Sequence, residues 1–230
     1  MIQAFHLTKA DLPGVVILQD AYFSVPEGSF TVVLGDNPFA TSALFKVLAG
    51  EAKPDSGTVR VDHHDIYGFS SSERHRWLLE VGLIFPDLKL FFDKTVEENI
   101  LFILHAKGVS GPGQSDAILK LLSKAGMGDK LKVKVEDLSV SEKQMVLALR
   151  AMIFRPRLLL AEDPFRGLDA GALALLVRFF AELNKTGTTI VLSTKQTAFW
   201  EETKKIGEGL SIQWVKLEDG KIHPLEEKVS

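Results

Sequence analysis

The sequence predicts an α/β fold in which a mostly parallel core sheet is covered by helices on both faces. Short apolar stretches such as those within 157–163 and 188–194 are typical of strands that are buried on both sides. They alternate with longer segments whose apolar residues recur at helical spacing. In the first third, apolar segments instead follow one another with only Gly and Pro between them. This part of the chain is therefore predicted to be antiparallel β structure.

The elements of the N-terminal half follow from these patterns. A helix expected over 42–49 ends at Gly50, because glycine readily adopts the backbone conformation that ends a helix. A capped helical turn leads into a buried strand within 70–85. The segment 93–127 is mostly helical, with a loop at 108–116, where glycine is frequent. The strand-forming segments of this half lie in 2–7, 14–28, 29–35 and 53–68.

The C-terminal half continues the alternation. Ser139 is a suitable cap for a strong helix that Pro156 halts, since proline cannot continue a helical hydrogen-bond ladder. The following strand ends in two carboxylates. We expect a single domain over 1–230. The remaining elements are a helix over 170–186, a strand over 188–194 and a hairpin over 210–225.

Composition narrows the class of protein. The 230 residues are 46% hydrophobic and 25% charged, as in ordinary globular domains. The net charge of −3 argues against nucleic acid as a partner. The absence of cysteine excludes disulfides and thiolate metal sites. Because neither a signal-peptide pattern nor a membrane-spanning apolar segment is found, we expect a cytoplasmic protein or one peripheral to a membrane.

Three candidate functional residues follow the ends of predicted parallel strands. Gly35 ends a buried strand that runs through a short loop into a helix, which is the arrangement of a phosphate-binding loop. Asp163 and Lys195 follow two other buried strands. Because ligands of parallel α/β sheets bind at the carboxyl ends of the strands, we expect these residues to lie close together.

Five segments in register resemble the ATP-binding subunit of ABC transporters, and most closely the branch with FtsE and its lipoprotein-export and MacB-like relatives. The resemblance implies a P-loop NTPase fold with a core of 1–86 and 151–230 and a helical subdomain at about 87–150. It also implies ATP and Mg²⁺ as cofactors. The matching segments are VVLGDNPFATSALFKVLAGEAKPDSGTV, VGLIFPD, DKTVEENI, DLSVSEKQMVLALRAMIFRPRLLLAEDPFRGLD and AELNKTGTTIVLSTKQ.

The segment that matches the Walker A loop lacks most phosphate-binding features. Thr41 occupies the lysine position, and Ala40 replaces the second glycine of the motif. Pro38 has no N–H to donate, and Asp36 adds negative charge. We therefore predict weak or no binding of phosphate. The nucleotide-contact positions implied by the resemblance are Gly35, Asp36, Asn37, Pro38, Phe39, Ala40, Thr41, Ser42 and Ala43, of which Ser42 keeps the hydroxyl of a Mg²⁺ ligand.

The signature loop is also altered. The family uses it to contact the nucleotide held by the partner subunit, and here it contains Ser139, Val140 and Ser141. Val140 replaces a glycine that must approach phosphate closely, so its branched side chain disfavours that contact. Ser139 remains as a helix cap. The D-loop keeps Asp169, whose position also serves subunit contacts, and Pro86 replaces the Q-loop glutamine.

The Walker B carboxylates occur in reversed order. Glu162 takes the metal position and Asp163 the position of the catalytic base, where the shorter side chain falls short of the water. Lys195 replaces the switch histidine. Two interpretations of Lys195 stay open: it binds a γ-phosphate in place of the missing lysine, or it neutralises Asp163 or Glu162 in an empty site.

Two functions follow from the resemblance. The first is a pseudo-ATPase, FtsE-like subunit that docks on an inner-membrane permease such as an FtsX-like protein, at the inner face of the cell membrane. The second is an active or slow ATPase that uses Lys195, Ser42, Glu162 and Asp163 to power transport or cell-envelope and cell-division work. Either would act as a homodimer or as a heterodimer with an ABC ATPase paralogue. The candidate docking residues are Leu88, Leu90, Phe91 and Phe92, two of which equally suit the subdomain's own core.

Overall fold

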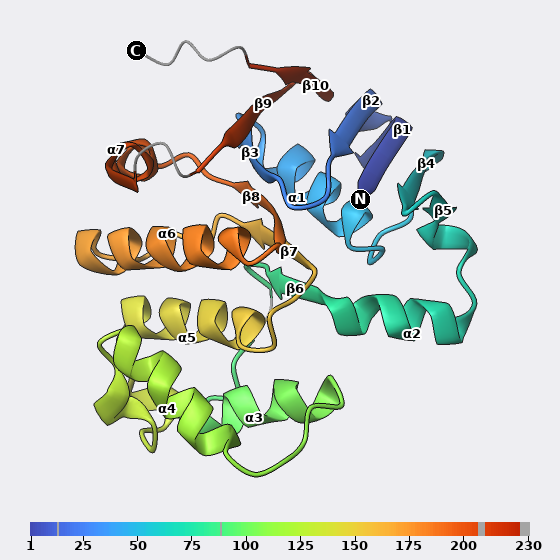
Figure 1. Cartoon of the computed structure of the whole chain (residues 1–230). Coiled ribbons are helices and arrows are strands. Elements are labelled where there is room, and N and C mark those ends of the chain that lie inside the picture. Colours follow the sequence, from blue (N-terminus) through green and yellow to red (C-terminus); the bar gives the residue numbers. More distant parts are fainter. Residues whose placement is uncertain (13, 88, 207–209, 226–230) are drawn as a thin grey trace.

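The computed structural model describes residues 1–12, 14–87, 89–206 and 210–225 and contains two sheets (Figure 1). The first is antiparallel, in the order β2-β1-β4-β5. Its strands are β1 (Ile2–Leu12), β2 (Val15–Val25), β4 (Ser56–Val61) and β5 (His64–Asp65). This arrangement confirms the antiparallel N-terminal part.

The second sheet has the order β10-β9-β3-β8-β7-β6. All its neighbouring strands are parallel except β10, which forms the expected hairpin with β9. The predicted α/β class with a mostly parallel core sheet is confirmed. The strands are β3 (Phe30–Gly35), β6 (Val81–Ile84), β7 (Leu158–Glu162), β8 (Thr189–Ser193), β9 (Ile212–Glu218) and β10 (Lys221–Pro224).

Helices cover both faces of this sheet. In Figure 1, α1 lies on the side of β1 and β2, whereas α3, α4 and α5 gather at the opposite end of the molecule, below α6. None of the helices in the described ranges is long and apolar enough to cross a membrane. The helices are α1 (Pro38–Leu48), α2 (Ser71–Glu80), α3 (Val96–Ala106), α4 (Gln114–Lys124), α5 (Val140–Met152), α6 (Ala170–Lys185) and α7 (Thr197–Ile206), with 3₁₀ turns η1 (Ile66–Gly68), η2 (Gly128–Lys130) and η3 (Val135–Asp137).

The core consists of two apolar clusters, one on each face of the parallel sheet. Successive residues of a strand contribute to opposite clusters, as the pleat requires. In β7, Leu159 packs with α5 and α6, while Leu158 and Leu160 pack with α1 and the antiparallel sheet. Because both faces are covered, β7 is apolar without alternation, which explains the pattern seen in the sequence.

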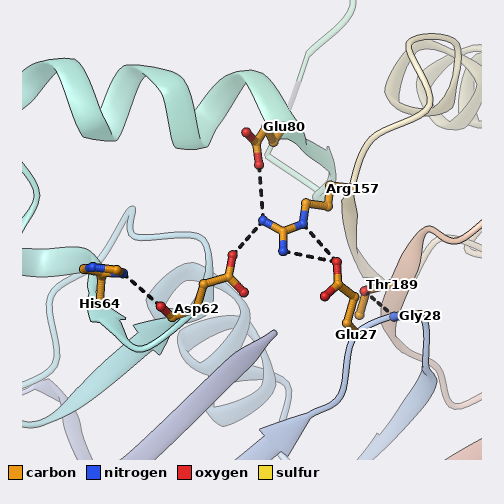
Figure 2. A network of polar contacts seen from close by, with 7 residues as sticks. All are labelled: Glu27, Gly28, Asp62, His64, Glu80, Arg157 and Thr189. Atoms are coloured by element: carbon orange, nitrogen blue, oxygen red, sulfur yellow. Dashed lines mark hydrogen bonds and ion pairs between the residues drawn. The ribbon is translucent and has the colours of Figure 1, made fainter.

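An ionic network centred on Arg157 connects the two sheets (Figure 2). Arg157 directly precedes β7, and its guanidinium lies 3.1 Å from Glu27, in the β2–β3 connection, and 2.6 Å from Asp62, after β4. Glu80 at the end of α2 lies 3.7 Å away. The Arg157 side chain is 37% exposed, so solvent screens these pairs. Each pair therefore contributes little to the stability of the fold.

Candidate functional site

A cavity of about 240 Å³ lies at the carboxyl ends of β3, β7 and β8. The structure thus brings together the strand-end residues that the sequence placed at one edge. The volume is below the ~300–1,000 Å³ that is usual for ligand pockets. Its lining residues are Gly35, Pro38, Thr41, Glu162, Asp163, Arg166, Ser193, Thr194 and Lys195.

The loop after β3 is shorter than expected, because α1 begins at Pro38 and not at 42. Asn37 is the N-cap, and its Oδ1 accepts hydrogen bonds from the N–H groups of Phe39 and Ala40 at 2.9 and 3.4 Å. Pro38 suits the first helical position since it needs no N–H partner there. Together, Asn37 and Pro38 convert the predicted loop into a capped first turn.

Thr41 fills the space that this loop would enclose. Its side chain is buried, and its hydroxyl donates to the Asn37 carbonyl at 3.0 Å. A Cβ added at Gly35 would lie 2.2 Å from the Thr41 Oγ1 atom. Gly35 is therefore required here for close packing against Thr41. Of the other positions matched to Walker A, Asp36 and Phe39 are exposed, and Ser42 and Ala43 are half-buried.

Glu162 and Asp163 have different environments. Burial raises the pKa of the Glu162 carboxyl above its usual value, although the nearby Ser42 hydroxyl acts in the opposite direction. Its Oε2 atom is buried with no hydrogen-bond partner among the residues that the structure describes. Asp163 has a left-handed backbone, φ 46°, which is uncommon outside glycine. Its N–H donates to Ser193, and its carboxylate lies 2.8 Å from the Arg166 guanidinium. Asp163 is thus neutralised by a residue three positions further along the chain.

The interpretation that Lys195 neutralises a Walker B carboxylate is wrong. Its Nζ donates to the backbone carbonyl of Asp36 at 2.8 Å and so connects the end of β8 to the start of α1. Arg166, which the sequence analysis did not single out, supplies the countercharge instead. In the sequence, the i, i+3 spacing of Asp163 and Arg166 is the feature that indicates this ion pair. Lys46, in the last turn of α1, pairs with Asp87 at 2.7 Å.

The first turn of α5 confirms Ser139 as a helix cap. Ser139 Oγ accepts from the Glu142 N–H at 3.2 Å, and the Ser139 N–H donates to the Glu142 carboxylate at 2.8 Å, which completes a capping box. Ser141 donates to Asp169 at 3.0 Å, so the signature segment contacts the D-loop. Val140 is 71% exposed.

The candidate docking residues have different environments. Leu90 is buried in the core cluster of the helical region, whereas Phe91 and Phe92 are exposed. Phe91 packs edge-to-face on Phe102 of α3, with ring centroids 4.9 Å apart. Leu88 lies outside the described residues. Of the four predicted docking residues, Phe91 and Phe92 are therefore exposed aromatic residues. Together with Phe102 they form an exposed aromatic patch.

No group of three or more His, Asp or Glu side chains suited to a metal occurs in the part of the chain that the structure describes. The Ser42 hydroxyl and the Glu162 carboxylate are the oxygen donors at the positions implied for Mg²⁺. Because Mg²⁺ in such sites is completed by substrate phosphates, these two donors depend on a nucleotide being held.

These observations define an ATP-binding cassette: a parallel sheet, a tight turn from β3 into α1, and carboxylates at the end of β7. The pattern of the ABC transporter family matches residues 18–166, and the chain belongs to that family. Among curated relatives, the cell division ATP-binding protein FtsE of Escherichia coli K12 is 32% identical over 84% of this chain and 87% of its own length.

A methionine import ATP-binding protein, MetN of Bradyrhizobium diazoefficiens, is 32% identical over 80% of this chain and 54% of its own length. Among solved structures, a dimeric bacterial ABC transporter cassette has a TM-score of 0.83 at 22% identity and covers 98% of this chain and 99% of that one. A dimeric cassette bound to ADP and phosphate has a TM-score of 0.81 at 22% identity, with the same coverage. At this identity the two structures support the fold alone.

Proposed function

We propose that this chain is a pseudo-ATPase of the ABC family, which docks on a membrane permease without turnover of ATP. The observation that carries the proposal is the self-capped first turn of α1. The Asn37 side chain occupies the N–H groups of Phe39 and Ala40, and Pro38, the first helical residue, has no N–H to offer. Phosphate binding at a helix N-terminus requires these donors to be free.

Charge and shape support the same conclusion. The family lysine is replaced by Thr41, which is buried against Gly35. Lys195 is directed to the Asp36 carbonyl, and Arg166 to Asp163, so each of these cations already has a protein partner. The residues present therefore do not fit a bound nucleoside triphosphate.

Calorimetric titration with Mg²⁺ and a non-hydrolysable ATP analogue tests the proposal. We expect no heat up to millimolar nucleotide, whereas micromolar binding would overturn it. The matched variant combines Pro38→Gly, Ala40→Gly and Thr41→Lys, which returns the missing glycines and lysine. We expect this variant to bind the analogue. If the variant folds but gives no heat of binding, the residues at these three positions do not explain the absence of nucleotide binding.

The partner follows from the relatives and from one exposed patch. FtsE and MetN are named for cell division and methionine import, and both are ATP-binding proteins. We propose that an FtsX-like permease places a helix on the aromatic patch of Phe91, Phe92 and Phe102. The chain would then lie at the inner face of the membrane, as one of two cassettes.

Co-purification with such a permease in detergent tests the docking. Phe91→Ser with Phe92→Ser should reduce recovery of the complex by about tenfold, because burial of two phenyl rings is lost. Phe39→Ser is the matched control, since Phe39 is 65% exposed but lies at the start of α1. Equal loss in both variants would contradict docking at this patch.

One observation favours the second candidate, an ATPase with an altered site. The unpartnered Oε2 atom of Glu162 is the kind of group that a cation would satisfy. In that case Lys195 or Ser42 would supply the remaining contacts to a nucleotide. Hydrolysis that disappears in both Glu162→Gln and Lys195→Ala would establish this function and exclude the first.

A further inference from the structure

A second hollow lies among the helices, and none of its lining residues belongs to the candidate site. It has a volume of about 410 Å³ and lies where the C-terminal parts of α4, α5 and α6 meet. Its apolar lining includes Leu121, Ile153 and Phe179. A neighbouring hollow of about 370 Å³ adjoins it and shares Ala117, Ile153 and Arg155, and we call the two together the groove.

The rim of this groove is positively charged. Lys120, Lys124 and Arg155 line it, against a single acid, Glu182. Lys124 and Glu182 lie 4.0 Å apart, and both are largely exposed. Neither Lys120 nor Arg155 forms an ion pair with any residue that the structure describes. Two cations are therefore left without a countercharge beside an apolar surface.

Helix dipoles explain only part of this charge. A cation in the last turn of a helix is favourable because the C-terminal carbonyls carry partial negative charge. Lys124 occupies the last turn of α4 and fits this explanation. Lys120 lies one turn earlier, and Arg155 lies beyond the end of α5. Their position on the rim suggests a role toward a partner.

We propose that this groove binds an acidic amphipathic helix from a partner protein. Apolar side chains at i, i+3, i+4 and i+7 of such a helix would enter the groove between α4 and α6. Its flanking carboxylates would pair with Lys120 and Arg155, which gives the contact its charge preference. This site is separate from the aromatic patch of the proposed function and does not depend on it.

The probe is a labelled helical peptide of about 18 residues, with Leu at those four positions and Glu on the flanks. A second peptide carries Lys in place of Glu. Fluorescence anisotropy with the full chain should give at least about tenfold tighter binding of the acidic peptide at low salt. Equal binding of the two peptides, or binding of neither, would overturn the proposal.

Reversal of the charges on the rim of the groove tests where the acidic peptide binds. Lys120→Glu with Arg155→Glu should weaken binding of the acidic peptide by about tenfold or more. Lys53→Glu with Arg76→Glu makes the same change of net charge at exposed positions outside the groove and should leave binding unchanged. Leu121→Gln should also weaken binding, with unchanged thermal unfolding as the check on folding. Equal losses in both double variants, or a response only to anionic phosphatidylglycerol vesicles, would contradict the assignment.

Discussion

The first turns of α1 and α5 both lie near the loop that follows β7, and each is capped by the side chain of its own N-cap residue. In α1 the cap is Asn37, which accepts from two N–H groups and leaves none of them for a ligand. In α5 the cap is Ser139, a residue that the family pattern also contains, in a capping box with Glu142. The two turns thus use different caps: a side-chain amide on two N–H groups in α1, and a reciprocal capping box in α5.

The difference indicates how each contact to nucleotide would be lost under the proposed function. At α1 the donors themselves are occupied, and Thr41 fills the space beside Gly35. At α5 the cap is unchanged and the obstacle is steric, since the branched side chain of Val140 is 71% exposed in front of the turn. Four predictions test this comparison, from the largest expected effect to the smallest.

Gly35→Ala should have the largest effect, a loss of about 2 kcal/mol in the free energy of unfolding, because the added methyl group overpacks the turn. The contact responsible is the 2.2 Å approach to the Thr41 Oγ1 atom. Urea denaturation measures the loss. Thr41→Ala should relieve most of it in the double variant, whereas Thr41→Val, which keeps the branch, should not. Equal losses in all backgrounds would show that Thr41 does not fill the loop.

Asn37→Ala should cost about 1.5 kcal/mol of unfolding free energy, because two N–H groups lose their acceptor. Asn37→Asp is the matched variant, since it keeps the acceptor and adds a favourable charge at a helix N-terminus. We expect it to be as stable as the parent in the same urea titration. A stable Ala variant would mean that the cap does not hold the first turn.

Ser139→Ala should cost about 1 kcal/mol, somewhat less than Asn37→Ala, because the reciprocal bond from the Ser139 N–H to Glu142 survives. Ser139→Thr should retain the cap. The comparison between α1 and α5 is contradicted if Ser139→Ala is the more damaging of the two Ala variants.

The pH dependence of Glu162 should be the smallest effect. Since the folded protein raises the pKa of this carboxyl, it holds the proton more tightly than the unfolded chain does. Stability from this group is therefore greatest at acidic pH and falls as pH rises from the ordinary carboxyl value through the raised one. Glu162→Gln should remove this part of the profile. Chemical denaturation at a series of pH values checks it, and an unchanged profile would contradict the effect of burial.

Much of the fold could be predicted because local patterns encode it. The uninterrupted apolar residues of β7 predicted a strand buried on both faces, and the two core clusters confirm this. The cap at Ser139 followed from its residue type and its place before an apolar helical segment. The start of α1 at Pro38 differs from the predicted start at 42, because the resemblance implied a loop there, whereas the Asn37-Pro38 pair favours the start of a helix.

The sequence by itself determined the covalent facts of the site: no lysine at position 41, no N–H at Pro38 and a carboxylate pair after β7. Only the tertiary structure decided which groups pair with one another. Lys195 bonds to the Asp36 carbonyl and Arg166 to Asp163, because the ends of β3, β7 and β8 meet at one edge. The same holds for the groove with the basic rim, whose residues come from α4, from the end of α5 and the segment after it, and from α6. Side-chain partners depend on distances in space, which a local pattern does not contain.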